Sequence, residues 1–134
     1  MGTVRLWTDE EAASDARVAA VFADIRVMRG SDFINNFWRA LANQPAALER
    51  TWAKLKVVMM EPGELDPLTK ELIYIAVSTV NGCGYCVHSH SAAARAKGMT
   101  EGQHGELLGV IGMAMETNAL ATALQIAVDG AFLV

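Results

Sequence analysis

Two cysteines and a histidine share one face of a helix that we expect from about residue 83 to just before Gly98. The segment reads Cys83-Gly-Tyr-Cys86-Val-His88-Ser-His90 and contains both cysteines of the chain. At roughly 100° per residue, Cys83, Cys86 and His90 fall on one side of such a helix. His88 falls nearly opposite, where we expect a structural or exposed residue. The spacing therefore predicts a dithiol with one imidazole a turn away.

This arrangement suits thiol chemistry, because the thiolate rather than the thiol attacks electrophiles. A cysteine in the first turn of a helix lies near the positive end of the helix dipole and near unpaired backbone N–H groups. Both lower the pKa of a thiol from its usual value of about 8.5. A second cysteine three residues away can close a disulfide. His90 can accept or return a proton near neutral pH.

A carboxylate precedes the cysteines, near the start of a helix expected over residues 67–80. The residues that follow Glu71 in this helix are all uncharged, so the helix is expected to be buried on most sides. A carboxylate among apolar neighbours needs a partner, and Ser78 lies on the same face. Because the tight turn Asn81-Gly82 joins the two helices into a hairpin, we expect Glu71 to contact His90, directly or through water.

Helix signals divide the whole chain, whereas strand signals are nearly absent. Before the hairpin we expect one helix from the capping box Thr8–Glu11 to about Met28 and a second from Ser31 or Asp32 to about Leu41. A third begins at Pro45 and buries a stripe of Leu48, Trp52, Leu55 and Met59. After the hairpin we expect a helix from Thr100 to a break near Met115–Asn118, and then a last amphipathic piece with Leu120, Leu124, Ile126 and Ala127. Gly30 suits a left-handed helix cap. The pattern predicts one all-α domain over residues 1–134, with the central helix hairpin carrying the C-x-x-C motif.

The composition predicts a globular protein that associates with copies of itself. Without glycine, hydrophobic residues already make up 52% of the 134 residues, whereas roughly 45–50% with glycine included is typical. Such an excess favours a homo-oligomer. The 11 basic and 15 acidic residues form no basic cluster, so we expect no nucleic-acid partner. The sequence shows no run of 18 apolar residues and no signal-peptide core. We therefore expect a cytoplasmic protein without a membrane partner.

The joint spacing of these residues resembles a known motif. Glu71, eleven intervening residues, Cys83-x-x-Cys86, three more residues and then His90 resemble the core motif of the AhpD-like alkylhydroperoxidases, of the carboxymuconolactone decarboxylase superfamily. Residues 66–98 and the segment from Asn118 to Gln125 are also similar to that family. The resemblance implies an AhpD-like all-helical fold that assembles as trimers or as hexamers built from dimers.

The same resemblance implies a thiol peroxidase that reduces alkyl hydroperoxides without a cofactor or a metal. Cys86 would be the peroxidatic thiol, Cys83 would resolve its sulfenic acid as a disulfide, and Glu71 and His90 would form a proton relay. The best-known members carry a histidine immediately before the second cysteine, where this chain has Tyr85. The reductant would be a dithiol or a lipoylated protein.

Other functions are compatible with the same residues. Dithiol chemistry in general includes a disulfide oxidoreductase that does not act on peroxides. The superfamily also includes cofactor-free decarboxylases, but the cysteine pair argues against that chemistry. Cys83, Cys86, His90 and Glu71 could together bind zinc, although three ligands from one helical face are unusual for a structural zinc site. A non-catalytic helical assembly protein would leave the pattern of cysteines and histidine unexplained.

Overall fold

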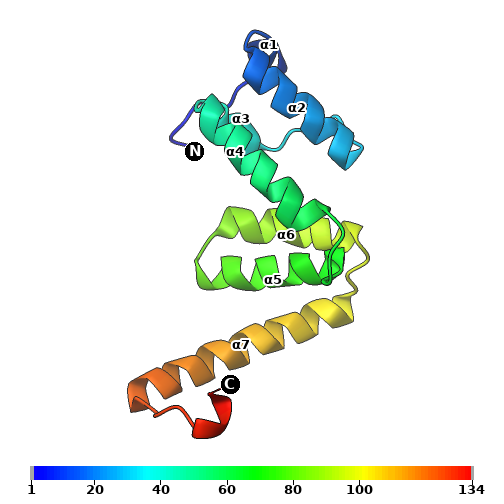
Figure 1. Cartoon of the computed structure of the whole chain (residues 1–134). Helices are drawn as coiled ribbons and strands as arrows, with labels where there is room; N and C mark the ends of the chain where they lie inside the picture. The colour runs from blue at the N-terminus through cyan, green and yellow to red at the C-terminus, as the bar shows by residue number, and fades with distance from the viewer. Residues whose placement is uncertain (1, 134) are drawn as a thin grey trace. The chain divides into compact units, whose positions relative to one another are not determined.

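The computed structural model describes residues 2–133, and within that range its regular structure is entirely helical (Figure 1). The expected all-α class is therefore confirmed. The chain separates into two compact units, Met1–Glu61 and Pro62–Val134. The expectation of one domain over residues 1–134 stays a prediction.

The unit Met1–Glu61 is built around aromatic and branched apolar side chains. Its helices are α1 (Asp9–Ala13), α2 (Ala16–Arg29), α3 (Asn36–Leu41), α4 (Pro45–Leu55) and a π-helical turn (Lys56–Met60). One apolar cluster joins them: Ala12, Val18, Val21, Phe22, Ile25, Ile34, Trp38, Ala42, Leu48 and Trp52. Of the three neighbouring aromatic residues Phe33, Phe37 and Trp38, Trp38 is buried, whereas Phe33 and Phe37 are exposed.

The prediction of one helix from Thr8 to about Met28 is wrong, because the chain breaks at Ser14 and Asp15. The Ser14 hydroxyl donates to the Glu11 carbonyl (2.6 Å), which closes α1. The Asp15 backbone is extended, and its carboxylate accepts the N–H groups of Arg17 and Val18 as the N-cap of α2. Short polar side chains thus compete with the helical backbone in the middle of the predicted helix. The expected left-handed cap at Gly30 is confirmed, with φ at 61°.

Two other predictions in this unit need correction. The second helix begins at Asn36 rather than at Ser31 or Asp32. The Ser31 hydroxyl accepts the Phe33 N–H, and this local bond favours a turn over a helix. Met59 is half-buried and Met60 packs against the core instead, because the helix widens from α to π at Lys56 and the buried face rotates.

The unit Pro62–Val134 contains the predicted hairpin. Its helices are α5 (Pro67–Val80), α6 (Gly84–Ala96) and α7 (Glu101–Leu124), followed by a 3-10 turn over Gly130–Phe132. Helices α5 and α6 lie side by side, as the green and yellow-green ribbons of Figure 1 show. A small apolar cluster holds the unit together: Ile75, Ala94 and Met99, with Leu68, Leu72 and Leu107 partly buried against them.

Local signals in the sequence set the bounds of the hairpin. The Asp66 carboxylate accepts the Thr69 N–H (3.0 Å) and so caps α5, and Pro67 occupies the first helical position. At the turn, Gly82 adopts a φ of 70°, a conformation that residues with a side chain rarely take. The Cys83 N–H then donates to the Ser78 carbonyl (2.9 Å). These contacts fix where the cysteine pair begins.

Helix α7 is unbroken, so the predicted break near Met115–Asn118 and the separate last piece are both wrong. Gly109 and Gly112 each cost about 1 kcal/mol relative to alanine, but the surrounding leucine, methionine, alanine and glutamate residues favour a helix. Most of α7 is exposed, and Ile111 is its one buried residue in the described range. By length and composition alone, α7 could also cross a membrane; a helix that packs against protein can meet the same criterion.

Candidate redox site

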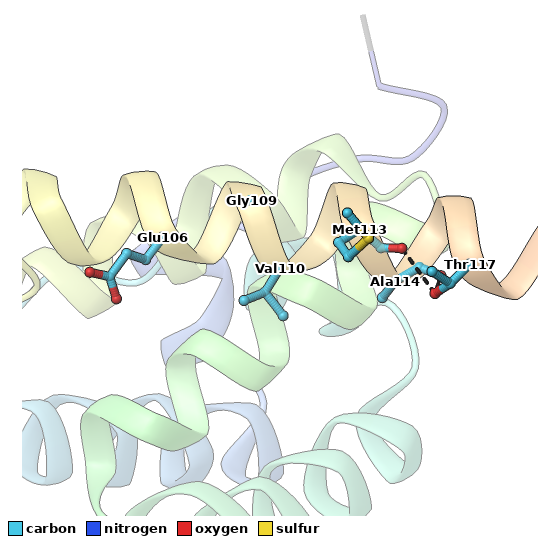
Figure 2. Close-up of a pocket in the computed structure, with 6 residues that line it drawn as sticks. All are labelled: Glu106, Gly109, Val110, Met113, Ala114 and Thr117. Carbon is cyan, nitrogen blue, oxygen red and sulfur yellow. Dashed lines mark hydrogen bonds between the residues drawn. The ribbon is translucent and has the colours of Figure 1, made fainter.

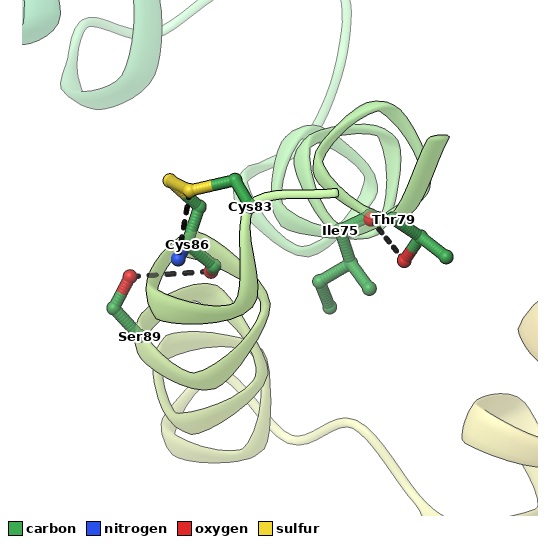
Figure 3. Close-up of a disulfide and its surroundings, with 5 residues drawn as sticks. All are labelled: Ile75, Thr79, Cys83, Cys86 and Ser89. Atoms are coloured by element: carbon green, nitrogen blue, oxygen red, sulfur yellow. Dashed lines mark hydrogen bonds between the residues drawn. A yellow bond between two sulfur atoms is a disulfide. The ribbon is translucent and has the colours of Figure 1, made fainter. Parts of the chain in front are cut away.

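The two cysteines form a disulfide at the N-terminus of α6, as Figure 3 shows. Cys83 is the N-cap residue, and its sulfur accepts the Cys86 N–H at 3.3 Å. The Ser89 hydroxyl donates to the Cys86 carbonyl one turn later (3.2 Å). Both cysteines are half-buried. An unpaired backbone N–H at the positive end of a helix is the environment that stabilises a thiolate when the disulfide is reduced.

Glu71 and His90 are in direct contact across the hairpin. Glu71 Oε2 lies 2.6 Å from His90 Nδ1, so the contact expected from the sequence is present without an intervening water. The Glu71 side chain is 6% exposed and that of His90 is 18% exposed. Because Nδ1 faces the carboxylate, Nε2 is the ring nitrogen left for exchange with another group.

Lys97 makes a second contact with the same carboxylate, which sequence reasoning missed. Its Nζ donates to Glu71 Oε1 at 2.8 Å. Lys97 is the C-cap residue of α6 and follows His90 by seven residues, or two turns, so both side chains lie on one face of the helix. The seven-residue spacing between His90 and Lys97 was the feature of the sequence that could have predicted this contact. Each oxygen of Glu71 therefore has its own basic partner.

Tyr74 also belongs to this cluster and was also missed. Its ring stacks on the His90 imidazole, with ring centroids 3.6 Å apart and an angle of 20° between the planes. Tyr74 follows Glu71 by three residues, so both reach α6 from the same face of α5. Carboxylate and tyrosine together fix the position and the plane of the imidazole.

The electrostatics of Glu71 keep it charged. Burial raises the pKa of this carboxyl, but the hydrogen bonds from His90 and Lys97 and their positive charges lower it by more. The net result is a pKa below the usual value for glutamate. Glu71 is therefore a carboxylate at neutral pH, and it can accept a hydrogen bond from the His90 Nδ1–H.

The remaining predicted residues lie on the same helix hairpin. Ser78 is buried on the face of α5 that packs on α6, and its carbonyl holds the Cys83 N–H. Tyr85, at the position where the family motif has a histidine, is exposed in the first turn of α6. His88 is exposed, as expected. Within residues 2–133, no three histidine, cysteine, aspartate or glutamate side chains are placed to hold a metal ion.

Among the described residues, two hollows on this unit are lined neither by the cysteines nor by His90. One is an open groove along α7, which Figure 2 shows, lined by Glu106, Gly109, Val110, Met113, Ala114 and Thr117. The other is a mostly apolar cavity of about 490 Å³ between α5 and α7, whose lining includes Val77, Val80 and Ile111. These residues lie on faces of the helices that the hairpin contact leaves uncovered.

Comparison with known proteins shows the family. Residues 46–129, well over half of the chain, match the carboxymuconolactone decarboxylase family. The chain belongs to this family. Within the family it is AhpD-like: it is 63% identical to the alkylhydroperoxidase AhpD core from Rhodospirillum rubrum ATCC 11170, known from a crystal structure. That similarity has a TM-score of 0.98 and covers 100% of this chain and 98% of the other.

Two curated AhpD relatives of this chain are longer than it is. The alkyl hydroperoxide reductase AhpD of Azorhizobium caulinodans is 30% identical over 133 residues, which cover 97% of this chain and 68% of that protein. AhpD of Solibacter usitatus is 36% identical over 77 residues, covering 58% and 42%. Protein 4 of the cox locus of Paracoccus denitrificans, which is uncharacterised, is 33% identical over 88 residues, covering 66% and 76%.

Proposed function

We propose that the protein is a thiol-dependent peroxidase that reduces alkyl hydroperoxides through a dithiol–disulfide cycle of Cys83 and Cys86. One observation carries the proposal: the paired carboxylate and imidazole of Glu71 and His90 stand one helical turn beyond Cys86, in the helix whose N-terminus bears the disulfide. The relatives named alkyl hydroperoxide reductase, and the similar alkylhydroperoxidase core, support hydroperoxides as the substrate class.

The first half of the cycle reduces the peroxide. His90 accepts the Cys86 proton at Nε2, while Glu71 holds Nδ1–H and stabilises the resulting imidazolium. The Cys86 thiolate attacks the terminal oxygen of the hydroperoxide, so that an S–O bond forms and the O–O bond breaks. The leaving alkoxide takes the proton from His90 and departs as an alcohol. Cys86 is then a sulfenic acid.

The second half of the cycle restores the thiols. Cys83 attacks the Cys86 sulfur, an S–S bond forms, the S–O bond breaks, and hydroxide leaves as water with the Cys83 proton. This step yields a Cys83–Cys86 disulfide, and a disulfide between these two residues in the structure supports the pairing. An external dithiol, either a small molecule or a lipoyl-bearing protein, then supplies two electrons and two protons.

Cysteine variants test the cycle and the roles of the two thiols. In steady-state turnover of tert-butyl hydroperoxide with dithiothreitol, Cys86→Ser should lose at least about 1,000-fold in kcat/KM, because no nucleophile remains beside the relay. Cys83→Ser should still consume one equivalent of peroxide and accumulate a sulfenic acid on Cys86. Retained turnover in Cys86→Ser, with a sulfenic acid on Cys83 instead, would reverse the roles.

Wild-type protein that exchanges disulfides with a dithiol but leaves peroxide intact would point to a general disulfide oxidoreductase. Turnover of a muconolactone-type acid by both cysteine variants would instead favour decarboxylase chemistry without a cofactor. Either result contradicts the peroxidase proposal.

We also propose that the protein works in the cytoplasm as a homo-oligomer, a trimer or a hexamer, with no nucleic-acid or membrane partner. The exposed apolar face of α7 supports association with copies of the chain, because Val110, Met113 and Leu124 are all exposed. Light scattering coupled to size exclusion should give a mass three or six times that of the chain. A monomer at micromolar concentration would contradict this part of the proposal.

A further inference from the structure

Lys97 lies outside the motif that links this chain to its family, yet it contacts the carboxylate at the centre of the site. We propose that Lys97 is a positioning residue: it contacts Oε1 of Glu71, leaves Oε2 to hold His90 Nδ1, and so lowers the affinity of the Glu71–His90 pair for a proton. The inference deepens the proposed peroxidase function and depends on it for its role in catalysis.

The geometry divides the two oxygens of Glu71 between two groups. Oε1 accepts from Lys97 Nζ at 2.8 Å, and Oε2 faces His90 Nδ1 at 2.6 Å. The Glu71 side chain is 6% exposed, so water offers it little compensation, whereas the Lys97 side chain is 38% exposed and keeps part of its hydration. The lysine can therefore neutralise the buried carboxylate at a modest desolvation cost of its own.

This division of charge has a consequence for the imidazole. If Lys97 were absent, the buried carboxylate would have His90 as its remaining positive partner, and the Glu71–His90 pair would bind a proton more tightly. With Lys97 present, the carboxylate already has a cationic partner at Oε1, and the Glu71–His90 pair binds that proton less tightly. Because the two groups are coupled, the shift belongs to the pair rather than to one residue.

The contacts given for His90 and for the helices around it, within residues 2–133, involve an aromatic ring, a disulfide, an apolar side chain and an ion pair near the solvent. From α5, Tyr74 contributes an aromatic ring and Glu71 the carboxylate. From α6 come the two cysteines, which form the disulfide. From α7, the residue packed against the cluster beneath the site is Leu107, and Glu101 is engaged with Arg95 at 3.6 Å near the solvent. Lys97 is thus the cation in direct contact with the carboxylate.

The test compares the ionisation of His90 in four proteins: wild type, Lys97→Met, Lys97→Arg and Lys54→Met. Lys54→Met is the matched control, because it removes one exposed lysine charge from α4. The imidazole Cε1–H resonance of His90 is followed by NMR against pH in the oxidised protein. His88→Gln and His104→Gln assign the signals of the 3 histidines.

We expect the His90 midpoint to rise by about one pH unit or more in Lys97→Met, as loss of a charge in contact requires. It should stay within about 0.3 unit of wild type in Lys97→Arg and in Lys54→Met. Lys97→Gln, which keeps a donor but no charge, should behave like Lys97→Met. Far-UV circular dichroism checks that each variant is folded. A midpoint in both Lys97→Met and Lys97→Gln equal to that of wild type would overturn the inference.

The pH dependence of thiol reactivity connects this result to catalysis. In the reduced protein, the pH profile of Cys alkylation by iodoacetamide should be shifted in Lys97→Met relative to wild type, because thiolate formation depends on the charge of the neighbouring imidazole. Lys97→Arg should restore the wild-type profile. An unshifted reactivity profile would contradict the positioning role. The NMR titration needs no peroxide, so failure of the peroxidase proposal and failure of this inference give different results.

Discussion

The two units of the molecule bury different kinds of side chain. The unit Met1–Glu61 places two tryptophans and a phenylalanine in one continuous core. The unit Pro62–Val134 has a core of Ile75, Ala94 and Met99, and beside it a buried, charged Glu71 with its partners. Apolar burial stabilises a fold directly, whereas a buried carboxylate costs free energy that its partners offset only in part.

The difference shows where stability and chemistry reside. The first unit has the composition of a stable scaffold. In the second unit, the charged Glu71 and its partners occupy much of the small interior, and most of α7 is exposed. Such a unit gains stability when a second surface covers its apolar helix, which is why the proposed oligomer and the proposed site belong together. Chain positions 7, 38 and 52 hold all 3 tryptophans, so tryptophan fluorescence reports on the first unit alone.

The largest expected effect is on the core of the first unit. Trp38→Ala should lower the free energy of unfolding by about 3–5 kcal/mol, because a large buried ring leaves a cavity. Trp38→Phe should lower the free energy of unfolding much less. Phenylalanine keeps an aromatic ring and removes the indole N–H, which has no hydrogen-bond partner in the described part of the chain. Guanidinium unfolding followed by fluorescence of the remaining tryptophans measures both. Equal losses in the two variants would show that the core is not tightly packed there.

The next effect falls on the chemistry of the second unit. Glu71→Gln should lower kcat/KM for an alkyl hydroperoxide by about 100-fold, because a neutral amide no longer stabilises the His90 imidazolium. The control is Glu106→Gln, which changes an exposed carboxylate on α7. A rate in Glu71→Gln within about twofold of wild type would remove the carboxylate from the mechanism.

The same carboxylate should make the stability of the second unit depend on pH. The pKa of Glu71 in the folded protein lies below its ordinary value of 4.5. Its contribution to stability is therefore complete above about pH 4.5 and is lost as the pH falls through the folded-state pKa. The difference in unfolding free energy between wild type and Glu71→Gln should narrow as the pH falls below 4.5. A difference that stays constant with pH would contradict the ionised state of Glu71.

The smallest effect concerns a helix cap. Asp66→Ala should cost about 1 kcal/mol, because it leaves the Thr69 N–H at the start of α5 without its acceptor. Unfolding followed by circular dichroism and by tyrosine fluorescence measures the loss of unfolding free energy. Both tyrosines, Tyr74 and Tyr85, lie in the second unit. Asp66→Asn, which retains an acceptor, should recover most of this loss. If Asp66→Asn were as unstable as Asp66→Ala, charge rather than capping would explain the effect.

Much of the fold could be predicted from the sequence because its signals are local. Thr8 caps a helix and a helix follows Thr100 as predicted, and Gly30 adopts the left-handed conformation expected after a helix. The errors arose where two local preferences compete. At Ser14 and Asp15, side-chain hydrogen bonds prevail over helix continuation, whereas in α7 good helix formers outweigh Gly109 and Gly112 in its middle.

The site could be predicted in part for a similar reason. Spacing along α6 and a tight turn were enough to bring His90 to Glu71, because the two helices have one simple way to pair. The roles of Lys97 and Tyr74 were not predicted, because their contacts depend on the direction of their side chains across the hairpin. A lysine at the end of a helix is ordinarily solvated, and an aromatic residue in an apolar helix ordinarily belongs to the core.

The most direct test of the redox cycle is a count of free thiols. The fully reduced protein is titrated with a thiol reagent before and after one equivalent of tert-butyl hydroperoxide. The proposed cycle predicts a fall from two thiols per chain to none, with both recovered after treatment with dithiothreitol. Two thiols that persist after the peroxide is added would contradict the proposed cycle.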